Sequence, residues 1–258
     1  MAYGTYTRLA FRHYAGCMYA ESYTRAYNRI VALMEGKDPG VVVPACPDWS
    51  ATDVIRHLAG LSVDITSGLF EGFASDDWTD AQVSARADMS LEEVIAEWSS
   101  VIDEAASLLD DLESLGLPDR VPSALGVTSI KAIAPMAISD ILHHEFDLRN
   151  AYEDASGRDL MDIHFAAAGH ARSVRGAFAA HDLPTIRIVS TDSGMSWDIG
   201  HNEPVAVLEA SSFEIMRAIG GRRTKGEMRA MGWEGDPEPF LDAMVLPHLA
   251  IRETSLRE

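Results

Sequence analysis

The sequence predicts an α+β fold that is mainly α, with an all-helical bundle over residues 1–182 and a small α+β domain over residues 183–258. Apolar residues recur every three or four positions through long stretches before residue 182, as in amphipathic helices. Near Pro184 the pattern changes to the alternation that is typical of strands. A chain of 258 residues with 47% hydrophobic residues is large enough for two modest cores.

The first expected helix covers residues 17–36, and an extended connector rich in proline follows over residues 41–47. The second helix is expected to begin at Ser50, whose hydroxyl can accept hydrogen bonds from the first-turn amides. Asp53 completes a capping-box pattern with Ser50. This helix is expected to run to about Phe73.

The bundle continues with expected helices over about 90–115, 129–154 and 161–180. Residues 75–88 are acidic and irregular in pattern, and residues 117–128 are expected to form a loop. Pro135 either kinks the fourth helix or marks its true start, because proline is tolerated in a first turn but not in a helix interior.

Strands are expected in the small domain over residues 185–191, over 195–199 and from Val205 onward. Ser212 is expected to cap a helix that ends at Gly220-Gly221. A final helix is expected over about 237–246. The sequence therefore indicates a mixed domain that follows the bundle.

The composition limits the classes of partner and compartment. Acidic residues outnumber basic ones by 40 to 21, and the net charge of −19 argues against nucleic acid and anionic membranes as partners. We find no apolar run near ~18 residues and no signal peptide in Met1–Arg8, so a cytoplasmic location is expected. Cys17 and Cys46 provide no disulfide framework, and both are interpreted as structural thiols.

The most informative segment is Asp140-Ile141-Leu142-His143-His144-Glu145-Phe146-Asp147-Leu148. Asp140 and His144 are four residues apart, so they project from the same face of a helix. The second expected helix carries His57. Two histidines and one carboxylate from two helices can form a three-ligand metal site with open positions, although the same spacing also suits an ordinary ion pair.

Several neighbours compete with these residues or could support them. His143 lies three residues after Asp140 and is an alternative to His144, and the apolar pattern does not decide between them. Asp147 is a candidate to orient the ring of His144, or else an acid that faces solvent. Arg56 points about 100° away from His57 on an ideal helix and is a weaker candidate. Cys46 is interpreted as a packing residue rather than a nucleophile.

Arg222 and Arg223 follow two glycines at a predicted helix end. A loop of this kind can carry the guanidinium groups to a substrate carboxylate and hold it through two hydrogen bonds. We therefore name both as candidate catalytic residues. The alternative is that they pair with acids of the protein surface.

Two motifs carry a family resemblance. The segment Val43-Pro44-Ala45-Cys46-Pro47-Asp48-Trp49-Ser50-Ala51-Thr52-Asp53-Val54-Ile55-Arg56-His57-Leu58-Ala59-Gly60 resembles the N-terminal signature of the maleylpyruvate isomerase-like proteins of actinobacteria. These proteins belong to the DinB-like, metal-binding four-helix superfamily. The segment from Asp140 to Leu148 is similar to the second motif of the family, and the region after residue 185, with Gly220-Gly221-Arg222-Arg223, is similar to its sterol-carrier-like C-terminal domain.

The resemblance implies a set of ligands and a thiol partner. Carried over position by position, it makes His57, Asp140 and His144 the ligands of a divalent metal ion, with zinc expected first and nickel or iron as alternatives. It also implies mycothiol as cofactor or co-substrate, together with a small electrophilic substrate. Family members usually have Glu at the position of Asp140, and Asp is one methylene shorter, so the ion would lie closer to this helix.

These observations predict a metal-dependent mycothiol S-transferase or thiol-dependent isomerase, acting as a monomer or homodimer. A divalent cation favours the thiolate of a bound thiol, whose unperturbed pKa is about 8.5. One alternative is a cyclase or hydrolase that uses the same metal without a thiol. Two others are a non-haem iron oxygenase, which also uses two histidines and a carboxylate, and a metal-free binding or regulatory module.

Overall fold

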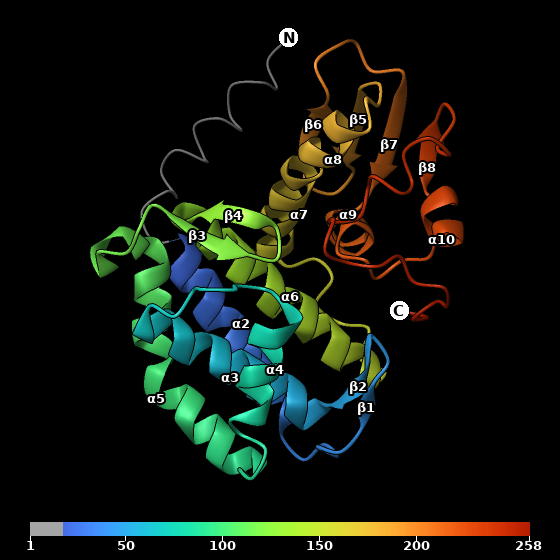
Figure 1. Ribbon diagram of the computed structural model, residues 1–258. Helices are drawn as coiled ribbons and strands as arrows, with labels where there is room; N and C mark the ends of the chain where they lie inside the picture. Colours follow the sequence, from blue (N-terminus) through green and yellow to red (C-terminus); the bar gives the residue numbers. More distant parts are fainter. Residues whose placement is uncertain (1–17) are drawn as a thin grey trace. The chain divides into compact units, whose positions relative to one another are not determined.

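The computed structural model of the protein describes residues 18–258 (Figure 1). Cys17 and the segment Met1–Arg8, in which no signal peptide is expected, lie outside the described residues. Helices dominate the described chain, and a small sheet lies in its C-terminal part. The predicted fold class, mainly α with a helical bundle and a small α+β region, is confirmed. Each helix within residues 18–258 is either too short or too polar to span a lipid bilayer.

The chain packs into two compact units. The first comprises the chain up to Val42 together with Asp48–Glu145, and the second comprises Val43–Pro47 together with Phe146–Glu258. The division by packing therefore falls inside a helix. The domain boundary at residues 182/183 stays a prediction from the sequence pattern.

The first unit is built from α2 (Met18–Met34), α3 (Ala51–Ser67), α5 (Leu91–Asp110) and the first part of α6 (Ile133–Ala151) (Figure 1). Helix α5 packs against both α2 and α3. The buried face of each helix follows the apolar stripe that the sequence indicates. The core of the first unit includes Tyr23, Ile30, Val54, Leu58, Trp98, Ile102, Ala137 and Ile141.

Helix α3 begins and ends at residues with clear local causes. Ser50 accepts a hydrogen bond from the amide of Asp53, and the Asp53 side chain accepts one from the Ser50 amide, so the predicted capping box is confirmed. The helix ends at Gly68, which adopts a left-handed conformation with φ of 67°. The predicted extension to Phe73 is therefore wrong, because the left-handed residue stops the helical hydrogen bonds.

Two other segments of the first unit differ from the sequence prediction. The acidic segment 75–88 contains a further helix, α4 (Asp76–Ser84), which Ser75 caps. The expected loop 117–128 contains the antiparallel hairpin of β3 (Arg120–Ser123) and β4 (Gly126–Ser129), and short helical turns η1 (Leu112–Leu115) and η2 (Ile130–Ala132) flank it. Short strands β1 (Val42–Val43) and β2 (Cys46–Ser50) begin in the expected connector, and β2 continues to the start of α3.

The second unit contains a four-stranded sheet in the order β6-β5-β7-β8. Strand β5 (Ile186–Ser190) pairs antiparallel with β6 (Ser196–Ile199) and parallel with β7 (Ala206–Ala210), while β8 (Gly232–Glu234) pairs antiparallel with β7. One face is buried against α7 (Met161–Ser173), α8 (Arg175–Ala180) and α9 (Ser212–Ile219) (Figure 1). The core on this face includes Ala171, Phe178, Ile188, Trp197, Leu208, Ile215 and Phe240.

The end of the chain contains two corrections. Ser211, not Ser212, caps α9, because its side chain accepts from the amide of Glu214. The helix expected over residues 237–246 is absent, and that segment forms successive turns. The short helix α10 (Lys225–Arg229) and strand β8 form instead, in a region that the sequence analysis did not assign.

His170 on α7 predicts a pH dependence of stability. Burial lowers the pKa of His170 to about 4, and the positive charges of the nearby Arg222 and His248 also lower it. A hydrogen bond with the Ala166 carbonyl acts in the opposite direction and raises this pKa, but by less. The unfolded chain takes up this proton near pH 6.5, so stability present at neutral pH is lost as the pH falls from 6.5 toward 4. The loss approaches about 1.4 kcal/mol per pH unit in that window.

The predicted pH dependence of stability is checked by urea unfolding of wild type and His170→Gln at pH 7, 6 and 5. The variant should lose less stability than wild type between pH 7 and pH 5, by about 2 kcal/mol. Parallel pH profiles for the two proteins would contradict the prediction.

Candidate metal centre

Three side chains of the first unit converge between α3 and α6. His57 projects from α3, and Asp140 and His144 project from successive turns of α6. The Nε2 atom of His57 lies 3.0 Å from Oδ2 of Asp140, and Nε2 of His144 lies 3.6 Å from Oδ1 of the same carboxylate. One potential ligand atom from each residue lies within 4.8 Å of the other two. Residues 83 positions apart in the sequence are thus brought together.

The group is buried on its histidine side and open on its carboxylate side. Both imidazoles are almost fully buried, whereas the Asp140 side chain is 35% exposed. The ring of Trp49 lies 5.4 Å from the His57 ring and 5.9 Å from the His144 ring, measured between centroids. The tryptophan therefore packs on both imidazoles and limits their orientations, and Asp140 is the member that solvent reaches.

A chain of hydrogen bonds supports His57 from its other side. Nδ1 of His57 lies 2.7 Å from Oε1 of Gln82, and Nε2 of Gln82 donates to Oδ2 of Asp64 at 2.6 Å. Gln82 belongs to α4, and Asp64 lies two turns after His57 on α3. Both nitrogens of the His57 ring therefore face an oxygen atom.

The charges of the group alter the pKa values around it. Burial disfavours the charged form of His57, but the adjacent Asp140 carboxylate and the Gln82 amide overcome this and raise the pKa of His57. Burial also raises the pKa of Asp64 above its usual value, against the opposing effect of Gln82 and Arg86. The pKa of Tyr23 is raised, mainly by burial, and Asp140 contributes in the same direction.

The donor set fits a divalent metal ion. Ligand atoms at about 2.1 Å from a tetrahedral zinc ion lie about 3.4 Å apart. The separations of 3.0 and 3.6 Å between ligand atoms of the group lie on either side of this value. Two imidazoles and one carboxylate are a common ligand set for catalytic zinc, which keeps a fourth position for water or substrate. The three residues thus suit an ion by their chemistry and by the two separations that join the imidazoles to Asp140.

The other candidates of the sequence analysis occupy different surroundings. His144, and not the adjacent His143, belongs to the group with His57 and Asp140. Arg56 forms an ion pair with Asp53 at 2.8 Å and donates to the carbonyls of residues 87 and 89. The side chain of Cys46 is partly buried.

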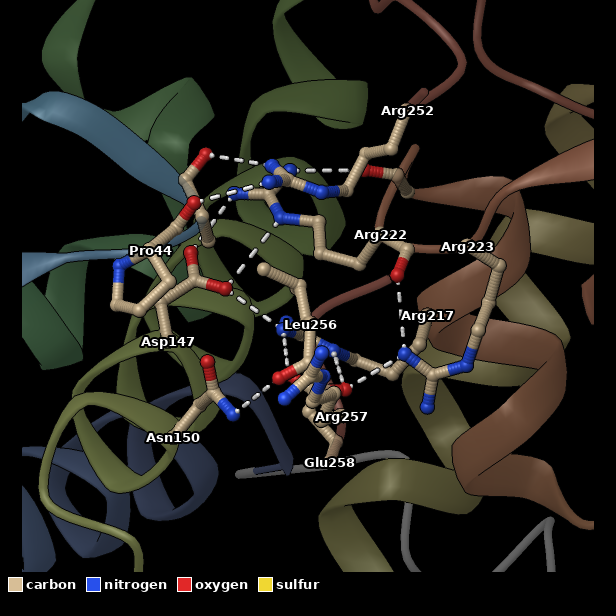
Figure 2. Close-up of polar contacts among 12 residues, drawn as sticks. Pro44, Asp147, Asn150, Arg217, Arg222, Arg223, Arg252, Leu256, Arg257 and Glu258 are labelled. Carbon is tan, nitrogen blue, oxygen red and sulfur yellow. Dashed lines mark hydrogen bonds and ion pairs between the residues drawn. The ribbon is translucent and has the colours of Figure 1, made fainter. Parts of the chain in front are cut away.

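Arg222 and Arg223 are engaged in ion pairs within the second unit (Figure 2). Arg222 donates to the buried carboxylate of Asp147 at 2.9 Å. Arg223 binds Glu214 through two hydrogen bonds of 2.7 and 2.9 Å and also contacts Glu258 at 2.6 Å. Their predicted pairing partner, a substrate carboxylate, is thus replaced here by carboxylates of the chain, and their catalytic role stays a prediction.

Trp49, Asp64 and Gln82 are parts of this site that the sequence did not predict. Asp64 had a readable signal, because positions 57, 60 and 64 share one face of a helix. Gln82 had none, since its segment is dominated by exposed acidic residues and did not indicate a helix. Trp49 lay within the quoted N-terminal motif without an assigned role.

Comparison with known proteins gives a family and a fold. A family model described as the mycothiol maleylpyruvate isomerase N-terminal domain matches residues 21–149, which is half of the chain. A crystal structure of the mycothiol-dependent maleylpyruvate isomerase is similar with a TM-score of 0.55 and 12% identity, covering 79% of this chain and 88% of that one.

A histidine-to-alanine mutant of that isomerase matches over the same shares of the two chains, with a TM-score of 0.54 and 10% identity. At such low identity these likenesses show a common fold, a DinB-like bundle with a C-terminal domain. The comparison with curated proteins finds no match.

Proposed function

This chain belongs to the mycothiol maleylpyruvate isomerase N-terminal domain family, and we propose that it is a divalent-metal-dependent enzyme of low-molecular-weight thiol chemistry. The observation that carries the proposal is the convergence of His57, Asp140 and His144, whose potential ligand atoms lie within 4.8 Å of one another. The proposed thiol is mycothiol, named for the family and for the two similar crystal structures. We propose a cytoplasmic location, where thiols are kept reduced.

His57, Asp140 and His144 would hold the ion, and zinc is the first candidate because two imidazoles and a carboxylate suit it. Nickel and iron bind the same ligand types and remain alternatives. When bound, a divalent ion supplies charge that favours the thiolate over the thiol at neutral pH.

Side chains around the group determine which side excludes water, which side is open to substrates and how the His57 ring is oriented. Trp49 and the buried faces of the two imidazoles exclude water from one side of the group. The 35% exposed side chain of Asp140 marks the side from which a thiol and an electrophile would enter. Gln82 accepts a hydrogen bond from Nδ1–H of His57, which leaves Nε2 of that ring to act as a ligand.

Two reactions use the same thiolate. In transfer, sulfur bonds to the electrophilic carbon of the substrate and stays attached, while a leaving group or a protonated carbanion balances the step. In isomerisation, sulfur adds to an activated double bond, the resulting single bond rotates, and elimination restores both the double bond and the free thiol. We favour transfer, because few members of such a family would have maleylpyruvate as their substrate.

Of the two candidate catalytic arginines, we favour Arg222. Arg223 is only 5% exposed and its donors are taken up by Glu214 and Glu258. The Arg222 side chain is 14% exposed, against 6% for Arg223, and it binds the Asp147 carboxylate and the Gly220 carbonyl. A substrate carboxylate would therefore reach the more exposed guanidinium of Arg222 more readily.

The proposal is tested by metal content and by the fate of the thiol. Purified protein should contain about one equivalent of a divalent metal per chain, and turnover of electrophiles, maleylpyruvate included, should require added mycothiol. Thiol that is consumed one for one with substrate indicates transfer, whereas thiol that is fully recovered indicates isomerisation. Metal-free protein that cannot be loaded, or turnover that is unchanged without thiol, would reject the proposal.

A further inference from the structure

We propose that Gln82 is a positioning residue that fixes the tautomer and the orientation of the His57 imidazole for metal binding, with Asp64 holding the amide of Gln82 in the required direction. This inference rests on the proposed metal centre, but one arm of its test does not need the metal. Gln82 lies on α4, in the segment that the sequence pattern indicated to be irregular.

The direction of the Gln82 amide follows from its two partners. Its Nε2 group donates to Oδ2 of Asp64 at 2.6 Å, and a carboxylate offers acceptors but no hydrogen to donate in return. The amide oxygen must then face His57, whose Nδ1 lies 2.7 Å away. An oxygen acceptor at that distance requires a hydrogen on Nδ1. The hydrogen-bond chain therefore selects the form of His57 whose Nε2 is available toward Asp140 and an ion.

Gln82 is held in place on every side that the structure describes. Its side chain is buried, with 4% exposure. Arg86 donates to the backbone carbonyl of Gln82 at 3.0 Å, and the same guanidinium pairs with Glu97 of α5 at 2.5 Å. These contacts tie α4 to a second helix of the bundle, so the amide is supported by rigid elements and not by a free loop.

Gly60 makes the approach of α4 to α3 possible. A Cβ atom at Gly60 would lie 2.5 Å from Cβ of Gln82 and 2.9 Å from Nη1 of Arg86, which is closer than real contacts allow. Gly60 and Asp64 follow His57 by three and seven residues, so all three share one helix face. On that face, His57 is the proposed ligand, Gly60 leaves space for Gln82, and Asp64 accepts a hydrogen bond from the Gln82 amide.

The expected effect on metal affinity is large for a residue that does not touch the ion. Histidine ligands commonly donate their second N–H to an oxygen acceptor, and removal of such a partner lowers metal affinity by about 10–100-fold. Asp64 should matter through Gln82, because its loss frees the amide to rotate by half a turn.

The test compares three variants with wild type by zinc titration against a chromophoric chelator. Gln82→Met keeps the length of the side chain but removes the acceptor, and should weaken zinc binding by about 10–100-fold. The double variant Gln82→Glu/Asp64→Asn keeps the total charge and an oxygen acceptor facing Nδ1 of His57, while the bond between residues 64 and 82 reverses so that the new amide at 64 donates to the new carboxylate at 82. It should therefore recover most of the affinity. Asp80→Asn removes an exposed charge from the same helix and should bind zinc as wild type does.

Chemical shifts of ¹⁵N in the His57 ring give a readout that does not need the metal. In metal-free Asp140→Ala protein, at a pH where His57 is neutral, the ring should carry its hydrogen on Nδ1. Adding Gln82→Met to this background should shift the hydrogen to Nε2. This measurement on metal-free protein tests the role of Gln82 even if wild type binds no zinc. A failure to bind zinc would count against the proposed function and not against the role of Gln82.

Three results would overturn the inference. One is zinc affinity of Gln82→Met within about twofold of wild type, well below the range for such partners. A second is a ring tautomer that does not respond to Gln82→Met. The third is a double variant that keeps the wild-type thermal unfolding midpoint without recovering affinity.

Discussion

His57→Ala protein is expected to bind zinc at least about 100-fold more weakly than wild type and to lose thiol-dependent turnover with it. Removing an outer hydrogen-bond partner of a histidine ligand already costs about 10–100-fold in affinity, so removing the ligand itself should cost more. His144→Ala should have an effect of similar size, because both imidazoles lie beside the carboxylate of Asp140. Metal content after dialysis, measured by elemental analysis, checks both variants.

The adjacent histidine provides a matched control. His143→Gln removes an imidazole that is also buried and belongs to the same helix, but that lies outside the group with His57 and Asp140. It should retain its metal. If His57→Ala kept a full equivalent of zinc while His143→Gln lost it, the ligand set would be wrong.

The sequence predicted the carboxylate-imidazole pair of α6 because helical spacing determines it: residues four apart share a face. It did not decide between His143 and His144, and the structure explains why. Every residue from 141 to 148 is buried, so this part of α6 has no exposed face from which its orientation can be read. Only tertiary packing, with Trp49 against His57 and His144, distinguishes the two histidines.

The sequence did not predict a role for Gln82, for a different reason. Helix α4 is short and mostly exposed, and three of its nine residues are aspartates. Such a helix has no apolar stripe to reveal it. What positions Gln82 is the space left by Gly60 and the anchor at Arg86, and both depend on contacts between helices.

The segment 237–246 shows how helical spacing misleads in a short stretch. Its apolar residues Phe240, Leu241 and Met244 are spaced as on a helix and are all buried. Their backbone nevertheless forms turns, in which Phe240 donates to Pro237 and Ala243 donates to Phe240, each three residues back. Packing onto the second unit's core buries these side chains without a continuous helix.

Arg217→Met is expected to destabilise the protein by about 3–5 kcal/mol, the usual cost of removing one partner from a buried ion pair. The Arg217 side chain is fully buried, donates to Asp147 at 2.7 Å and also binds Glu258 (Figure 2). Methionine preserves much of the length and apolar surface of the arginine, so the effect should come from charge. Urea unfolding of the variant, compared with wild type at the same pH, measures it.

The charge balance of the cluster makes the prediction specific. Arg217, Arg222 and Arg223 face Asp147, Glu214 and Glu258, and loss of Arg217 leaves one carboxylate in excess in a buried site. The double variant Arg217→Met/Glu258→Gln restores the balance and should recover part of the lost stability, which a double-mutant cycle reports as a coupling energy.

An exposed ion pair of the same unit provides the contrast. Arg187 binds Asp198 through two hydrogen bonds of 2.7 and 2.9 Å, a geometry as good as that of Arg217, but both side chains are nearly half exposed. Water can replace this partner, so Arg187→Met should leave the unfolding midpoint close to that of wild type. Equal losses from Arg187→Met and Arg217→Met would mean that burial does not set the cost, and the account of the arginine cluster would then be wrong.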